Sequence, residues 1–306
     1  MRIIKDTEQL DKRVEKAVLA IGNFDGVHLG HQELLRCARE QAAKIDGNSV
    51  AVTFWPHPIT LNKERQFVPL QPLPERLECI ARYDMDISMV LAFNREFANH
   101  TPEEFVTEKL LAFFDLKTVI IGFNHNFGRN RSGSVETMRQ LGEKYGFEVI
   151  ALEAIDFKDS PVSSSRIRRA LAVGKIKGVN ELLGREYCLS GKVVEGVGRG
   201  GKLLGFPTAN METKPRQLPL EGIYAVRVKF DDKSYMGALN IGISPTFKDT
   251  PKRLEVFLID YDGDLYGKTL QLDFVQRLRG EKKFDSIEAL KAQIAKDVQE
   301  VRNVLG

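Results

Sequence analysis

Cysteine is scarce in this chain, and long apolar runs are missing. The 306 residues include three cysteines, Cys37, Cys79 and Cys188, which are scattered and odd in number. This argues against a disulfide framework and against a cysteine-based metal cluster, and a reducing cytoplasm is the compartment that we expect. No apolar stretch reaches the length of a membrane span, so we expect no membrane partner.

Charge of one sign is also not in excess. The net charge is +3, and the parts before and after residue 185 each carry nearly balanced charges. A nucleic-acid-binding protein usually concentrates Lys and Arg in one domain or stripe, so we expect no nucleic-acid partner. The length predicts two domains, and an apolar fraction of 42% suffices for ordinary globular cores. We expect a monomer or a weak homo-oligomer.

The first part of the chain alternates short apolar strands with helical patterns. Strands are expected at 18–21, 49–54, 87–91, 118–121 and 147–151. Thr101 and Pro102 form a helix start, and another helix is expected from Ser134 to Tyr145. This alternation predicts an α/β fold with a doubly wound, mainly parallel sheet, which binds ligands at the carboxyl ends of its strands.

Beyond residue 185 the apolar period changes to two. Alternation at Tyr224, Val226, Val228 and Phe230, with turns at glycines and aspartates, predicts a small antiparallel β-barrel. A closing helix is expected from one apolar stripe, which comprises Ile287, Leu290, Ile294, Val298, Val301 and Leu305. Short helical pieces with Gly174, Gly178 and Gly184 predict a hinge between domains 1–182 and 183–306.

The most informative stretch is the glycine-rich run 196–210, Gly-Val-Gly-Arg-Gly-Gly-Lys-Leu-Leu-Gly-Phe-Pro-Thr-Ala-Asn. Successive bare N–H groups of such a loop can bind phosphates. Thr208 and Asn210 are two apart, so on an extended segment their oxygens share one face and can hold one hard cation. The alternative is a glycine-rich hairpin turn whose Thr and Asn bond local backbone.

Three later segments accompany this run: 219–226, 237–247 and Glu255-Val-Phe-Leu-Ile-Asp-Tyr-Asp-Gly-Asp-Leu-Tyr-Gly267. Together they closely resemble the riboflavin kinase family across residues 186 to 306. The resemblance implies that Thr208 and Asn210 bind Mg²⁺ and that Glu255 is the catalytic base. The residues implied at ATP are Gly196, Gly198, Arg199, Gly200, Gly205 and Pro207. Those implied on the flavin side are Arg279, Glu281 and Phe284.

Two histidines stand between the first strand and the first helix. His28 and His31 are three apart, so one helical turn places both imidazoles on the same face, at a helix N-terminus that favours phosphate. The alternatives are a zinc pair or two solvated loop histidines. Later, the serine-rich segment 161–168 precedes a helix expected at 169–173. Its arginines oppose the helix dipole, which indicates a bound anion; the alternative is an ordinary serine cap with solvated arginines.

His-x-Gly-His and Ser-Ser-Ser-Arg-Ile-Arg168 are signatures of the nucleotidyltransferase fold. With the contexts 22–31, Phe54-Trp-Pro-His-Pro58 and 122–128, residues 1 to 180 resemble the FMN adenylyltransferase half of bacterial bifunctional FAD synthetase. The resemblance implies a catalytic and ATP-binding set of Gly22, Asn23, Phe24, Asp25, Gly26, His28, His31, Ser164, Ser165 and Arg168. It implies a flavin-side set of Phe54, Pro56, Pro58 and Asn124. Trp55 departs from the glutamate that the family leads us to expect.

The expected function is therefore double. The barrel would phosphorylate riboflavin with ATP and Mg²⁺ to FMN, and the first domain would adenylylate FMN with ATP to FAD and pyrophosphate. Two other classes share parts of these patterns. An aminoacyl-tRNA-synthetase-like adenylate former shares His-x-Gly-His but leaves the barrel unexplained. A flavin- or nucleotide-sensing regulator would keep the binding loops and could dispense with Glu255.

Overall fold

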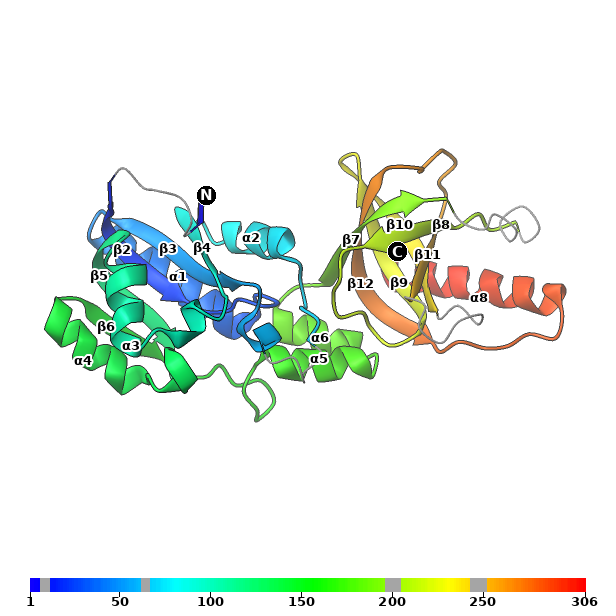
Figure 1. Cartoon of the computed structure of the whole chain (residues 1–306). Helices are drawn as coiled ribbons and strands as arrows, with labels where there is room; N and C mark the ends of the chain where they lie inside the picture. The colour runs from blue at the N-terminus through cyan, green and yellow to red at the C-terminus, as the bar shows by residue number, and fades with distance from the viewer. Residues whose placement is uncertain (6–11, 62–66, 196–204, 243–251) are drawn as a thin grey trace. The chain divides into compact units, whose positions relative to one another are not determined.

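The computed structural model describes residues 1–5, 12–61, 67–195, 205–242 and 252–306, which divide into two compact units, 1–164 and 165–306 (Figure 1). None of the helices in these ranges combines the length and the apolar character that a membrane crossing requires.

The first unit contains a six-stranded sheet in the order β1-β4-β3-β2-β5-β6, and all neighbouring strands run parallel (Figure 1). Parallel neighbours need crossover connections, and helices supply them as the alternating pattern predicted. The strands are β1 Arg2–Lys5, β2 Val14–Ile21, β3 Asn48–Trp55, β4 Ile87–Ala92, β5 Phe114–Gly122 and β6 Glu148–Leu152. The helices are α1 Leu29–Lys44, α2 Leu73–Ala81, α3 Pro102–Glu104 and α4 Val135–Tyr145. Shorter helical turns are η1 Pro58–Leu61, η2 Phe97–Asn99, η3 Phe105–Leu110 and η4 Arg129–Arg131.

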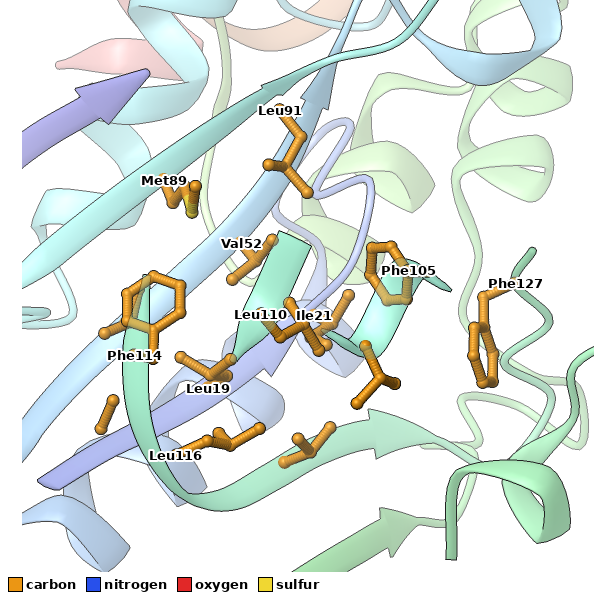
Figure 2. Close-up of a cluster of buried hydrophobic side chains, with 14 of the residues drawn as sticks. Leu19, Ile21, Val52, Met89, Leu91, Phe105, Leu110, Phe114, Leu116 and Phe127 are labelled. Atoms are coloured by element: carbon orange, nitrogen blue, oxygen red, sulfur yellow. The ribbon is translucent and has the colours of Figure 1, made fainter. Parts of the chain in front are cut away.

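Both faces of this sheet are buried. Along β2, Leu19 belongs to one hydrophobic cluster and Val18 to another, because successive side chains point to opposite faces. Figure 2 shows the first cluster, in which Leu19 and Val52 lie with Phe105 and Leu110 of η3. Residues of α1 and α2 pack in the second cluster. The doubly wound sheet is thus confirmed.

Local signals placed several helix boundaries correctly. The Thr101 side chain accepts the Glu104 N–H at 3.2 Å and the Glu104 carboxylate accepts the Thr101 N–H at 2.7 Å, which forms a capping box. The helix that this box opens has a single α-turn and continues as the π-helical segment η3. Ser134 caps α4, which ends at Tyr145 as expected.

The segment between the predicted domains consists of short helices, as predicted, but the first of them starts earlier than expected. Helix α5 Ser164–Ala172 begins earlier than residue 169, because Ile167 and Leu171 are both buried and need helical spacing. Gly178 lies inside helix α6 Ile176–Leu183, whose buried Val179 and Leu182 offset a glycine cost of about 1 kcal/mol. Helix α6 belongs to the second unit, where the Asn180 amide donates to the Phe274 carbonyl at 2.8 Å.

The second unit contains a closed barrel in the order β10-β11-β8-β7-β12-β9, as the period-two pattern predicted (Figure 1). All neighbouring strands for which pairing is described are antiparallel. The strands are β7 Tyr187–Val194, β8 Ala209–Thr213, β9 Gly222–Phe230, β10 Lys233–Gly242, β11 Arg253–Leu258 and β12 Thr269–Arg279. The interior holds Met211, Leu239 and Leu254, all buried.

Helix α8 Ile287–Leu305 packs on the outer face of the barrel. Val301 is buried there with Ala225 and Ile259, and Phe257 packs against the same cluster. Most of the predicted apolar stripe is confirmed as partly buried. Ile287 is the exception at 46% exposure, because it occupies the first turn of the helix.

Candidate active sites

The loop after β2 places both predicted histidines at the start of α1. His28 is the N-cap residue, and its Nδ1 atom accepts the His31 N–H at 3.4 Å. The two imidazoles stack with ring centroids 3.7 Å apart, and His28 is 7% exposed. The prediction that one turn brings both rings together is confirmed. In the described part of the chain no group of three or more His, Cys, Asp or Glu could hold a metal, so the histidine pair lacks the further ligands of a zinc site.

The backbone of this loop is held in an unusual conformation. Phe24 and Val27 have φ of 49° and 40°, a region that side chains rarely occupy, and Gly26 has φ of 89°. Strained backbone persists only where surrounding structure enforces it, and it occurs often at functional sites. One such constraint is the Thr53 hydroxyl, which donates to the Asn23 carbonyl at 3.0 Å.

The two nucleotidyltransferase signatures meet in space. The Ser164 hydroxyl donates to the Asp25 carbonyl at 2.7 Å, although the residues are 139 positions apart. Ser165 and Arg168 follow on α5. Ser164 of the serine motif therefore contacts the loop that carries His28. That the remaining residues of the motif also face the ATP phosphates stays a prediction.

A buried ion pair that the sequence did not reveal lies under this loop. Arg76 of α2 is fully buried, and its guanidinium lies 3.8 Å from the Asp25 carboxylate, which accepts the Leu70 N–H at 3.0 Å. The Arg76 guanidinium also donates to the Phe54 carbonyl at 3.2 Å and lies 5.5 Å from the Trp55 ring centroid. No local pattern marks Arg76, because its burial depends on which face of α2 meets the sheet.

The predicted flavin-side residues follow β3 and β5, at the same sheet edge as the histidine loop, because parallel strands end on one side. Phe54 is buried and its ring lies edge-on to Phe97 at 5.9 Å, so it contributes to the core. Pro56 and Asn124 are exposed, and Pro58 is half-buried at the start of η1. Their contact with flavin stays a prediction.

In the barrel, one transverse row joins residues from three separate motifs. Glu255 of β11 lies opposite Asn210 of β8 and opposite Asn240 of β10. Asn240 lies opposite Ile223 of β9, which in turn pairs with Arg279 of β12. Directly opposed side chains share one face of a sheet, here the outer face, because the buried interior residues alternate with them.

Further predicted ATP-side and metal-binding residues precede β8, near Asn210. Thr208 and Pro207 are exposed just before β8, and Gly205 has φ of 77°. The predicted residues Gly196, Gly198, Arg199 and Gly200 lie outside the described residues. Asn210 and Thr208 offer only oxygen ligands of the kind that Mg²⁺ prefers, so the donor set fits this cation.

At the other end of the row, Arg279 is held by helix α8. Its Nη2 and Nε atoms donate to the Asp297 carboxylate at 2.6 and 2.9 Å, and the Gln293 amide donates to the same carboxylate at 2.9 Å. Asp297 is 4% exposed, and sequence reasoning had no signal for it beyond a charge on an otherwise apolar stripe. Glu281 and Phe284 follow Arg279; Glu281 is exposed and Phe284 is half-buried.

Comparison with known proteins finds one family model in each part of the chain. The family model described as FAD synthetase matches residues 10–166, and the model described as riboflavin kinase matches residues 183–305. The chain belongs to the bifunctional riboflavin kinase/FMN adenylyltransferase family. Family relatives of that description include one from Buchnera aphidicola subsp. Acyrthosiphon pisum, 34% identical over 97% of this chain and 96% of the relative. Another, from Escherichia coli K12, is 33% identical over 100% and 98%.

The fold is shared over the whole length with a solved structure. A crystal structure described as a macrolide-efflux protein from Streptococcus pneumoniae has a TM-score of 0.90 and 30% identity, covering 99% of each chain. The bifunctional enzyme thus phosphorylates riboflavin in its C-terminal part and adenylylates FMN in its N-terminal part. ATP, riboflavin, FMN and FAD are its substrates and products, which overturns the synthetase-like and the regulator alternatives.

Proposed function

We propose that Glu255 is the general base of the kinase reaction. An alcohol is a poor nucleophile, and a carboxylate within hydrogen-bond reach assists it by accepting its proton as it attacks the γ-phosphate of ATP. The observation that supports this role is the register that sets Glu255 between Asn210 and Asn240. It brings a carboxylate beside the predicted cation ligand.

Thr208 and Asn210 would hold Mg²⁺ next to this base. The ion would offset negative charge on the transferring phosphoryl oxygens. The glycine loop that includes Gly205 and Pro207 would position ATP, and Arg279, Glu281 and Phe284 would contact the flavin. Asp297 supports this assignment because it fixes the Arg279 guanidinium in one orientation.

In the adenylyl step the phosphate of FMN attacks the α-phosphate of ATP, and pyrophosphate leaves. A phosphate monoester has a second pKa near ~6, so at neutral pH the nucleophile is already a dianion and needs no base. His28, His31 and Arg168 would stabilise the transition state, and the 22–26 loop, Ser164 and Ser165 would bind ATP. The Ser164–Asp25 contact supports this assignment. Phe54, Pro56, Pro58 and Asn124 would line the flavin side.

We further propose domain bounds of 1–182 and 183–306, a monomer or weak homo-oligomer, a cytoplasmic location and no nucleic-acid partner. The absence of a concentrated basic region in the sequence supports the last point.

Two variants of the full chain test the residue roles. Glu255→Gln should lower riboflavin phosphorylation by on the order of 10²–10⁴ and leave FMN adenylylation unchanged. His31→Ala should lower FAD formation by about 10²–10³ while FMN accumulates, because one donor to the transition state is lost. Riboflavin, FMN and FAD are separated by chromatography after incubation with ATP and Mg²⁺.

Matched controls are Glu212→Gln, an exposed glutamate on β8, and His100→Ala, both of which should keep both activities. Mixing the two site variants should restore FAD from riboflavin, one making FMN and the other adenylylating it. Equal loss of both activities in either single variant would contradict separate sites.

A further inference from the structure

Asn240 occupies a place in the kinase site that its sequence context does not explain. It lies directly opposite Glu255 on the neighbouring strand, on the outer face of the barrel. Directly opposed residues have Cβ atoms about 5 Å apart, so both side chains can reach the same small molecule. Asn240 is half-buried as a whole.

Among the residues that the structure describes, none donates a hydrogen bond to the amide oxygen of Asn240. Its Oδ1 atom is buried, and no hydrogen bond reaches it from any residue that the structure describes. Buried acceptors in native proteins are nearly always satisfied, and an exception needs an explanation. A ligand hydroxyl that arrives with the substrate would satisfy this oxygen.

A second polar side chain lies close to Asn240. A Cβ on Gly242 would lie 2.6 Å from the Glu281 Oε1 atom and 3.5 Å from the Asn240 Nδ2 atom. Glu281 and Asn240 therefore both lie next to Gly242. An amide offers one acceptor and two donors, which suits a polyol whose hydroxyls both donate and accept.

We propose that Asn240 is a substrate-contacting residue of the kinase site that binds a ribityl hydroxyl adjacent to the one that Glu255 deprotonates. This inference rests on the proposed role of Glu255. The Asn240 oxygen accepts the O–H of the neighbouring hydroxyl, which fixes the polyol chain so that the attacking oxygen faces Glu255. No bond forms or breaks at Asn240.

The test uses the full chain, riboflavin, and riboflavin analogues that lack one internal side-chain hydroxyl but keep the terminal one. Asn240→Ala should lower kcat/KM for riboflavin about tenfold, the effect of one lost hydrogen bond that leaves a partner unsatisfied. The KM for ATP and the rate of FMN adenylylation should stay unchanged. For the analogue that lacks the bound hydroxyl, wild type and Asn240→Ala should react at the same rate.

Asn240→Asp keeps the shape and adds a carboxylate opposite Glu255. Like charges raise each other's pKa, so the acid limb of the kinase pH profile should move to higher pH, which tests that residue 240 lies beside the base. If Asn240→Ala does not fold, Asn240→Ser replaces it in the comparison of riboflavin with the deoxy analogues. Asn303→Ala, an exposed asparagine on α8, is the matched control and should change nothing.

Two results would overturn the proposal. One is an unchanged kcat/KM for riboflavin in Asn240→Ala, provided that the separate Glu255→Gln variant has lost kinase activity. The other is an equal loss for riboflavin and for every deoxy analogue, which would make Asn240 a positioning residue. If instead Glu255→Gln keeps kinase activity, the proposed base fails independently of Asn240.

Discussion

Each unit of this enzyme contains an Arg–Asp pair among or next to its predicted site residues, and the two pairs are built differently. In the first unit Arg76 and Asp25 lie 3.8 Å apart with side-chain exposures of 0% and 1%, and each bonds to backbone. In the barrel, Arg279 and Asp297 are 2.6 Å apart, bond to each other directly, and are 16% and 5% exposed. The first pair clamps three chain segments together, whereas the second orients one side chain.

The difference follows from the two folds. In a parallel sheet the site is made by loops after the strand ends, and loops need tethers to backbone such as Leu70 and Phe54 provide. In the barrel the polar row lies on the strands themselves, so the ladder already fixes its backbone. Only the long side chain of Arg279 needs a partner.

The largest effect is expected from Arg76→Met, which removes the guanidinium from beside the buried Asp25 carboxylate. Breaking a fully buried pair costs about 3–5 kcal/mol, so the first unit should unfold at much lower denaturant while kinase activity persists. Urea unfolding followed by the emission of Trp55, the only tryptophan, measures this unit alone.

Arg139→Met is the matched control, because Arg139 is half-exposed and pairs only with Glu136 on the surface at 3.6 Å. It should cost about 0–1 kcal/mol. The double variant Arg76→Met/Asp25→Asn should recover part of the lost stability, since neither buried charge is then left alone. No recovery would show that the backbone contacts, and not the pair, carry the effect.

A smaller loss is expected from Asp297→Asn in the barrel. Arg279 keeps some solvent contact, so the cost should be that of a hydrogen bond to a charged group, about 1.5–3 kcal/mol. Riboflavin phosphorylation should weaken through a higher KM for riboflavin, and FMN adenylylation should be unaffected. Asp260→Asn, which breaks the exposed pair with Arg302, should leave both unchanged. If Asp297→Asn lowered the free energy of unfolding as much as Arg76→Met does, the two Arg–Asp pairs would not differ in the way described.

The smallest effect near neutral pH is a pH dependence of the first unit, which holds all five histidines. Burial lowers the pKa of His125 to about 4 from 6.5. Between these two pKa values the unfolded chain binds a proton at His125 and the folded chain does not. The free energy of unfolding should therefore fall as pH drops from about 6.5 toward 4. The slope for one proton is bounded at about 1.4 kcal/mol per pH unit.

His125→Phe should flatten this slope in urea unfolding followed by Trp55, because the ring contact with Phe127 remains while the titrating group is gone. The barrel, which has no histidine, should show no His-dependent change in this window. An unaltered slope in the variant would mean that other groups set the acid sensitivity of the first unit.

Sequence patterns alone determined the features that depend on near neighbours. The pairing of His28 with His31, the helix start at Thr101 and the change of apolar period after residue 185 are all local, and the structure confirms them. Local patterns misplaced the start of α5, because burial of Ile167 overrode weak propensities.

Only the tertiary structure decided which side chains lie next to the predicted site residues. Closure of the barrel sets the register that brings Asn240 next to Glu255, and a shift of one residue would turn that side chain to the other face. Packing of α2 on the sheet buries Arg76 against Asp25, some fifty residues earlier in the chain. Such contacts arise from long-range burial and strand pairing, which no short window of sequence contains.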